Sequence, residues 1–255
     1  MQVIIIGAGR GVRLMPTTED SPKCFAEVEG RRILDWTLTA FGENGLDRIG
    51  FIGGYRIEKV KEHYPHFIFR HNDQWPNNNI LASLFYAEDL MDDGFICCYS
   101  DILFNANVVA ALKASTADIA IGVDTAWTER YAERTEHPTD DAEKVAVENG
   151  RVIEIHRDLH DHHAHGEFIG VAKFSAAGAT RLRQAYHAAR EKHAGKPFRE
   201  AALFEKAYFI HLLQEMLEGG EKMAHVDTPG GYIEIDTQQD LDYARQYWAS
   251  NHLSR

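Results

Sequence analysis

Short apolar runs alternate with segments of helical spacing along the first half of the chain. The runs are rich in β-branched and aromatic side chains and end at glycine or polar residues, so they predict buried strands. They lie at residues 3–6, 47–52, 67–70, 94–99 and 118–123. Apolar residues recur at helical spacing within residues 33–43, 57–64, 80–90 and 108–114. This alternation is typical of βαβ units and predicts a parallel sheet with helices on both faces.

The pattern changes in the second half of the chain. Residues 144–147 and 152–156 flank Asn149-Gly150, a strong β-hairpin signal. We expect a strand at 168–174, helices at 177–190 and 201–217, a late strand pair at 222–226 and 232–235, and a last helix at 238–248. Neither a Pro/Ser/Gly-rich linker nor an internal repeat separates the halves. The sequence therefore predicts one α/β domain with an inserted hairpin region.

Composition narrows the classes of function. The chain has 255 residues and a formal net charge of −12, which argues against a nucleic-acid-coating role because counterion release needs a basic face. Apolar stretches stay well short of the ~20 residues of a membrane helix, and the N-terminal run lacks a preceding basic flank, so we expect neither a membrane partner nor a signal peptide. Three cysteines, two of them adjacent, argue against a disulfide framework and favour the cytoplasm.

The loop after the first predicted strand is rich in glycine. Gly7, Gly9 and Gly11 let the backbone approach a ligand and turn several N–H groups into one concavity, which suits a polyphosphate. The spacing matches neither a P-loop nor the dinucleotide fingerprint. Arg13 and Lys23 extend from the same loop, and charge neutralisation of this kind is what transfer at phosphorus requires. The alternative is an ordinary glycine turn with solvated basic residues.

A longer motif resembles the signature of the nucleotidyltransferases that act on sugar 1-phosphates and related small phosphates. It reads Gly7-Ala8-Gly9-Arg10-Gly11-Val12-Arg13-Leu14-Met15-Pro16, followed by Pro22-Lys23 and Val28-Glu29-Gly30. The resemblance implies a Rossmann-like three-layer αβα sandwich with a mixed, mainly parallel sheet. It also implies that a nucleoside triphosphate reacts with a phosphate-bearing acceptor and releases pyrophosphate. Arg13 and Lys23 would be catalytic, and Ala8, Gly9 and Gly11 would bind the nucleotide.

The same resemblance covers nearly the whole chain. It divides a single domain, 1–255, into a nucleotide-binding half at 1–125, an acceptor-binding half at 126–235 and a C-terminal helix at 236–255. A homodimer is left open.

Two aspartates are expected to hold Mg²⁺. A triphosphate needs a divalent cation, and Mg²⁺ in proteins takes one or two carboxylates, here at the carboxyl ends of strands. Asp101 follows a buried strand, in a Ser-Asp pair where the family usually has Gly-Asp. Asp236 follows the strand 232–235, and the resemblance maps it to a metal ligand with Glu234 nearby. The alternatives are a strand-end cap for Asp101 and a helix-start acid for Asp236.

The segment 74–84 is expected to read the nucleobase. Amides and hydroxyls can satisfy the edge of a base, which singles out Asn79 and Ser83. Alternatively, the asparagines only cap the following helix. The pattern resembles members that use CTP and transfer CMP to phosphocholine or phosphonates.

The acceptor itself is left open by the sequence. A trimethylammonium head would favour an aromatic and acidic box, whereas an anionic head would favour Arg130, Arg134 or Lys144. Arg157 stands roughly where sugar-phosphate members keep a lysine against the acceptor phosphate. The residues expected to bind the acceptor are Trp127, Tyr131, Arg157, Glu167, Tyr232 and Glu234.

The leading hypothesis is a Mg²⁺-dependent cytidylyltransferase acting on a small phosphate or phosphonate. The alternatives are a sugar-1-phosphate nucleotidyltransferase using UTP, dTTP or GTP, and a non-catalytic nucleotide-sensing module. The histidine-rich run 156–165 indicates a solvated loop, with metal binding as the alternative.

Overall fold

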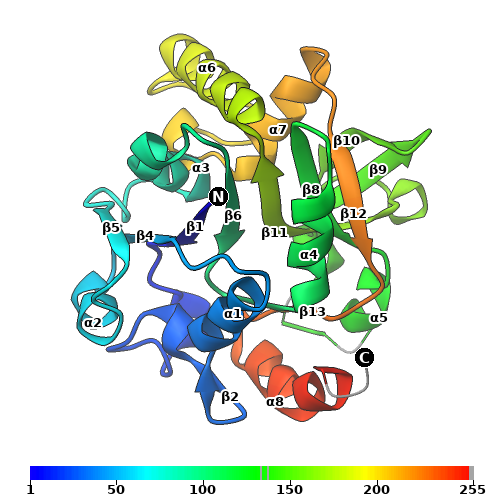
Figure 1. Cartoon of the computed structure of the whole chain (residues 1–255). Helices are drawn as coiled ribbons and strands as arrows, with labels where there is room; N and C mark the ends of the chain where they lie inside the picture. Colours follow the sequence, from blue (N-terminus) through cyan, green and yellow to red (C-terminus); the bar gives the residue numbers. More distant parts are fainter. Residues whose placement is uncertain (133, 137, 253–255) are drawn as a thin grey trace.

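A nine-stranded mixed sheet forms the centre of the molecule (Figure 1). The computed structural model describes residues 1–132, 134–136 and 138–252. The strands follow the order β10-β9-β11-β6-β1-β4-β5, with β8 paired to β11 and β12 paired to β8. Their bounds are β1 Gln2–Gly7, β4 Ile49–Gly53, β5 Ile68–His71, β6 Phe95–Tyr99, β8 Ile119–Asp124, β9 Lys144–Glu148, β10 Arg151–His156, β11 Gly166–Phe174 and β12 Ala224–Thr228.

Helices cover both faces of this sheet because its strands are apolar on both sides. In β1, Ile4 and Ile6 pack on one face, while Val3 and Ile5 pack on the other. The first face is covered by α3 (Ile80–Leu84), α6 (Ala176–His193) and α7 (Phe209–Glu218). The second face is covered by α1 (Ile33–Gly42), α2 (Ile57–His63) and α4 (Ala106–Ala114).

Strand β11 makes the sheet mixed. Strands β1, β4, β5 and β6 pair in parallel, whereas β11 runs antiparallel to β6, β8 and β9. The hairpin β9–β10 closes through Asn149 and Gly150, both with positive φ, as a turn of the primed type requires. The predicted α/β fold, with a mixed sheet between two helical layers, is confirmed.

The late strands differ from the prediction of a pair. Strand β12 lies parallel to β8, while β13 (Tyr232–Glu234) pairs antiparallel with β7 (Ile102–Phe104), a short strand that the sequence reading missed. The pairing of β7 and β13 forms a small sheet beneath the edge of the main one (Figure 1). A second small sheet joins β2 (Glu27–Val28) to β3 (Arg31–Arg32). The short helix α5 (Trp127–Tyr131) was also not predicted.

Two predicted helices are shorter than expected. The 80–90 segment is α3 followed by a 3-10 segment at Phe85–Leu90, and the 201–217 segment becomes α-helical only at Phe209. Ahead of Phe209, carbonyl groups accept hydrogen bonds from the start of α3: Glu205 O from Asn79 N (2.9 Å), and Ala207 O from Leu81 N (3.3 Å). These carbonyls serve another segment, so residues 201–208 do not continue the helix.

A third apolar cluster holds the last helix, α8 (Gln238–His252), against the N-terminal loop. Its buried members include Leu14, Val28, Ile235, Leu241 and Trp248. In Figure 1, α8 lies beside β2 and β13. The cluster fixes the loop that carries Arg13 and Lys23 close to the residues that follow β13.

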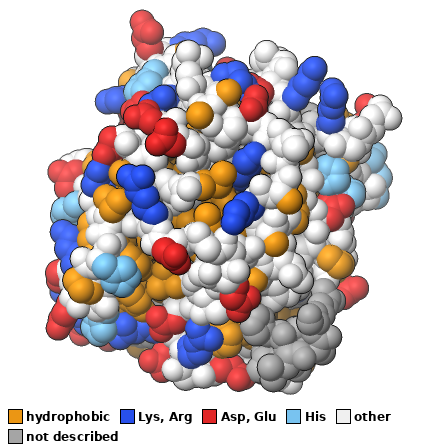
Figure 2. All heavy atoms as spheres, viewed as in Figure 1, with side chains coloured by type: hydrophobic (Ala, Val, Ile, Leu, Met, Phe, Trp, Pro, Cys, Tyr) orange, Lys and Arg blue, Asp and Glu red, His pale blue; other side chains and the backbone are white. Residues whose placement is uncertain are grey.

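On the face in Figure 2, acidic and basic side chains are intermixed around a central region where hydrophobic side chains are visible. Within the described residues, none of the helices is both long enough and apolar enough to cross a membrane.

Truncating Leu241 tests the third cluster. Leu241→Ala removes a fully buried side chain, so we expect the free energy of unfolding to fall by about 2–5 kcal/mol in urea titrations. Leu203→Ala is the matched control, because Leu203 is 42% exposed and its loss should cost less than about 0.5 kcal/mol. Equal losses in the two variants would contradict the packing described here.

Candidate active site

A cavity of about 550 Å³ opens at the carboxyl ends of β1 and β6. Its walls come from the glycine loop, the start of α3, the segment before β9, the strand β13 and Asp236. Lining residues that the sequence reading proposed are Ala8, Gly9, Gly11, Arg13, Lys23, Asn79, Ser83, Asp101, Arg157, Glu167, Tyr232, Glu234 and Asp236. The position at strand ends agrees with the ligand sites of open α/β sheets.

Gly11 allows the loop to fold over Lys23. Its φ is +67°, and a Cβ atom there would lie 3.1 Å from the Lys23 side chain. Thr18 Oγ1 donates to Gly11 O at 2.7 Å and closes the loop. A side chain at position 11 would therefore be strained and would also displace the lysine.

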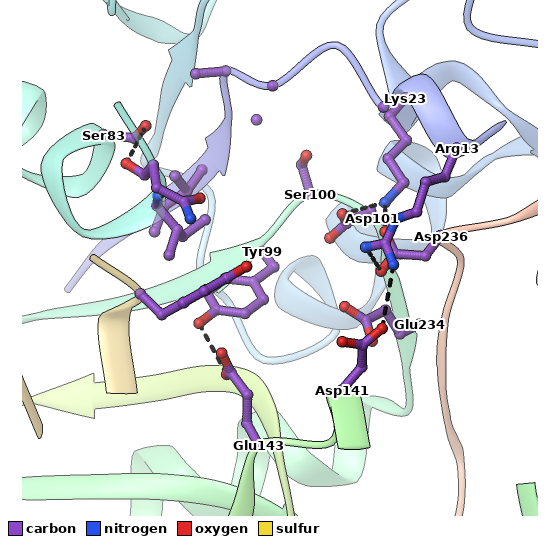
Figure 3. A pocket seen from close by; sticks show the side chains of 18 of the residues that line it. Arg13, Lys23, Ser83, Tyr99, Ser100, Asp101, Asp141, Glu143, Glu234 and Asp236 are labelled. Atoms are coloured by element: carbon purple, nitrogen blue, oxygen red, sulfur yellow. Dashed lines mark hydrogen bonds and ion pairs between the residues drawn. The ribbon is translucent and has the colours of Figure 1, made fainter. Parts of the chain in front are cut away.

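Four charged side chains form one ion cluster at the loop (Figure 3). Lys23 Nζ lies 2.7 Å from Asp101 Oδ2 and also contacts Asp236 Oδ1. Arg13 donates from Nη2 to Asp236 Oδ2 at 2.6 Å, and its Nη1 lies 3.4 Å from Asp141. The structure thus brings together the two predicted cations and the two predicted metal ligands.

Burial and neighbouring charges shift the pKa values in this cluster. Burial acts to lower the pKa of Lys23, but Asp101 and Asp236 outweigh it, so the pKa lies above its ordinary value and the ammonium stays charged. Burial raises the pKa of Glu234 well above its ordinary value, and repulsion from Asp236 and Asp101 raises it further. The acidic groups therefore exceed the positive charge beside them.

The acidic side chains fit a divalent cation. Asp101 and Asp236 offer carboxylate oxygens, the ligands that Mg²⁺ prefers, on the wall of a cavity large enough for a nucleotide. Their repulsion of Glu234 means that an additional positive charge would stabilise the site.

The wall opposite the ion cluster is a network of amides around Ser83 (Figure 3). Asn72 Nδ2 donates to Ser83 Oγ at 2.9 Å and to Asn78 Oδ1 at 2.9 Å. Asn79 caps α3, since its Oδ1 accepts from Ile80 N at 2.8 Å, and its Nδ2 donates to Lys206 O at 3.3 Å. The capping role considered for the asparagines is therefore real for Asn79, although Asn79 also lines the cavity.

Tyr99, Glu143 and Arg157 form a further polar network in the cavity, separate from the ion cluster and the amides. Tyr99 Oη donates to Glu143 Oε2 at 3.2 Å, and Arg157 Nη2 lies 3.5 Å from Glu143 Oε1. Burial raises the pKa of Glu143 to about 7, although Arg157 and Tyr99 oppose the shift. The Arg157 guanidinium lies over the Tyr208 ring, 3.9 Å from its centroid.

Only part of the aromatic and acidic box proposed for a trimethylammonium group faces the cavity, namely Glu167 and Tyr232. Trp127 and Tyr131 do not line the cavity; they lie behind Glu167, to which Tyr131 Oη donates at 2.7 Å. Arg130 pairs with Glu167, and its guanidinium covers the Tyr232 ring at 4.6 Å from the centroid. Arg130 does not line the cavity, so it contacts Glu167 and Tyr232 from outside, and both of these residues still face the cavity.

The basic side chains proposed to bind an anionic acceptor are likewise paired with other parts of the chain. Arg134 Nε lies 2.7 Å from Asp240, and Lys144 Nζ donates to Arg157 O at 3.0 Å and pairs with Asp161. Neither they nor Arg130 lines the cavity.

Several lining residues were not proposed from the sequence, among them Tyr99, Asp141, Glu143 and Tyr208. Asp141 and Glu143 lie in a polar segment whose sequence carries no motif. Tyr208 reaches the cavity through the junction between residues 204–208 and α3, a long-range contact without a local signal.

Comparisons with known proteins agree with the nucleotide site that the geometry indicates. A scan of protein-family models finds no match. The chain is 29% identical over 252 residues to a CTP:phosphoglutamine cytidylyltransferase of Campylobacter jejuni, covering 95% of this chain and 98% of that protein. It is 25% identical over 189 residues to a 2-aminoethylphosphonate cytidylyltransferase of Lancefieldella rimae, covering 72% and 71%.

A solved structure extends the similarity to the fold. The CTP:phosphocholine cytidylyltransferase of Streptococcus pneumoniae superposes with a TM-score of 0.73 at 19% identity, over 96% of this chain and 97% of that one. The glycine loop, the ion cluster and the end-to-end similarity to these relatives agree: the chain resembles nucleotidyltransferases along nearly its whole length.

Proposed function

We propose that this protein is a cytidylyltransferase that transfers CMP from CTP to a small phosphate or phosphonate and releases pyrophosphate. The observation that carries the proposal is the position of Lys23 between Asp101 and Asp236, beside the glycine loop, in a chain similar from end to end to a cytidylyltransferase. This arrangement supports an enzyme over a nucleotide-sensing module, because binding alone does not require two cations and two carboxylates in one contact.

The chain's own residues act by positioning and charge. An oxygen of the acceptor phosphate or phosphonate forms a bond to the α-phosphorus, while the bond from that phosphorus to the bridging oxygen breaks and the electron pair leaves with pyrophosphate. The attacking oxygen is already anionic near pH 7, so the step needs no general base. Arg13 and Lys23 neutralise the charge that builds up on the phosphoryl oxygens.

Mg²⁺ is the cofactor that we propose for this site, with Asp101 and Asp236 as its ligands and Glu234 beside them. When bound, it would neutralise triphosphate charge and act as a Lewis acid at phosphorus.

The acceptor is proposed to be small and to lack a quaternary ammonium group. Trp127 and Tyr131, two members of the proposed aromatic and acidic box, do not line the cavity, and Glu167 is already paired with Arg130. Arg157, held over Tyr208, faces the cavity and is suited to an acceptor phosphate or carboxylate. Glu143, whose Oε1 lies 3.5 Å from Arg157 Nη2, is suited to an amine or amide of the acceptor close to that phosphate or carboxylate.

A pyrophosphate-release screen tests the proposal. Four nucleoside triphosphates would be combined with phosphoglutamine, 2-aminoethylphosphonate, phosphocholine and several hexose 1-phosphates, with Mg²⁺ present. We expect release with CTP and with phosphoglutamine or 2-aminoethylphosphonate, and weaker release with phosphocholine. Asp101→Asn is the control and should reduce release to background while the circular dichroism spectrum is unchanged. Preference for UTP, dTTP or GTP with a hexose 1-phosphate would overturn the proposal, as would full activity of Asp101→Asn.

Removing the Lys23 ammonium should affect the transition state more than nucleotide binding. Lys23→Ala is expected to lower kcat by about 10²–10³-fold with a much smaller rise in the KM for CTP. Steady-state kinetics would measure both, with the exposed Lys61→Ala as the matched control. A rise in the KM for CTP with kcat unchanged would assign Lys23 to binding alone.

Ser83 should influence the choice of nucleobase. Ser83→Ala removes the hydroxyl that accepts from Asn72, so the Asn72–Asn78 pair loses its anchor and the CTP/UTP ratio of kcat/KM should fall several-fold. Ser115→Ala, a change distant from the cavity, should leave that ratio as in the native protein. A constant ratio in Ser83→Ala would place base recognition elsewhere.

A further inference from the structure

Two histidines and an aspartate meet at the surface outside the cavity. His165, His225 and Asp227 place one ligand atom each within 4.8 Å of the others, and none of the three lines the cavity. They form the single group of this kind among the described residues. Their side chains are 33%, 16% and 39% exposed, so an ion could reach them from solvent.

The fold fixes these three side chains from two segments. His225 and Asp227 are two residues apart on β12, so they project from the same side of the strand. His165 directly precedes β11, and its N–H donates to Val145 O at 2.8 Å. Gly166 anchors this point, because a Cβ there would lie 2.5 Å from Val123 and 2.6 Å from Asp124 O.

One carboxylate holds both rings. His165 Nε2 lies 2.9 Å from Asp227 Oδ2, and His225 Nδ1 lies 2.7 Å from Asp227 Oδ1. The ring centroids are 4.9 Å apart at 70°. Since an ionised carboxylate only accepts, both ring nitrogens donate, and both would exchange their protons for a metal bond.

The spacing suits a transition metal. Ligand atoms in a tetrahedral zinc site, with bonds of 2.0–2.2 Å, are roughly 3.3 Å apart, close to the two histidine–aspartate distances of 2.9 and 2.7 Å, and all three ligand atoms lie within 4.8 Å of one another. Two imidazoles and a carboxylate are a donor set for Zn²⁺ and for Co²⁺ or Ni²⁺, whereas Mg²⁺ prefers oxygen ligands alone.

We propose that His165 Nε2, His225 Nδ1 and the Asp227 carboxylate form a second metal site, selective for a transition metal ion of the Zn²⁺ class, with water at the remaining position. This site is separate from the carboxylates proposed for Mg²⁺ and does not depend on the function proposed above.

The rest of the histidine-rich run does not belong to this site. His156 pairs with Glu200 at 2.6 Å, away from His165. His160, His162 and His163 contact one another within the 157–165 loop, with ring centroids 4.1–6.2 Å apart. Figure 2 shows histidine side chains gathered at one edge of the molecule, on the side where β9 lies in Figure 1. These three rings are the natural competitor for a metal ion.

The site would join two segments that reach the cavity. Residues 157–165 connect Arg157 to His165, and β12 leads through residues 229–231 to Tyr232 and Glu234. An ion bound across His165 and Asp227 would link these segments outside the cavity, and would therefore stabilise the folded chain by mass action.

Titration of the untagged, metal-free protein with Zn²⁺ in excess Mg²⁺ tests the proposal. Isothermal calorimetry should give one tight equivalent of Zn²⁺, and Co²⁺ should give visible absorption bands of a site with nitrogen and oxygen ligands. Zn²⁺ should also raise the Tm. His225→Ala and Asp227→Asn should each weaken binding by about 100-fold and abolish the rise in Tm.

The double variant His162→Ala/His163→Ala is the matched control, since it removes two neighbouring histidines that are not ligands here. It should bind Zn²⁺ as the native protein does. Binding lost in this control but kept in His225→Ala would assign the metal to the loop and overturn the proposal, as would an absence of tight binding in the native protein. A Tm measured without metal identifies any variant that fails to fold, and Asp227→Asn, nearly isosteric, then decides.

Discussion

The pairing of β7 with β13 is the constraint on which the site depends. Asp101 directly precedes β7, and Asp236 is the second residue after β13. Antiparallel pairing of these strands therefore brings two aspartates that are distant in sequence to one place. Ile235 N donates to Asp101 O at 2.9 Å and extends the pairing to the aspartates themselves. The third apolar cluster holds this small sheet against the glycine loop, and the loop then delivers Lys23 between the carboxylates.

This assembly concentrates negative charge at a place where water is largely excluded. Burial and the neighbouring Asp101 and Asp236 raise the pKa of Glu234, so ionising all three carboxyl groups together is unfavourable even with Lys23 paired to two of them and the half-exposed Arg13 paired to Asp236. Stability is thus sacrificed at a site prepared for additional cations, a pattern typical of functional centres. The packing of α8 and β13 on the loop compensates for this local cost.

The sequence predicted what local signals determine. Apolar runs gave the strands of the parallel half, Asn149-Gly150 gave the hairpin, and the glycine loop with Arg13 and Lys23 gave one wall of the cavity. It failed where distant segments decide the outcome. Arg130 pairs with Glu167 and covers the Tyr232 ring from outside the cavity, and Tyr208 reaches the cavity from a segment whose carbonyl groups accept hydrogen bonds from the start of α3. No local sequence pattern predicts either of these contacts.

That junction between α3 and residues 204–208 has a consequence for how two substrates would influence each other. Backbone hydrogen bonds from Asn79 N to Glu205 O and from Leu81 N to Ala207 O connect the amide wall to the segment that leads directly into Tyr208, whose ring lies under Arg157. Ordering either wall therefore restricts the other, and the second ligand to arrive meets a partner whose conformational entropy is already reduced. Occupancy at the two ends of the cavity is expected to be cooperative, with reciprocal effects on the two dissociation constants.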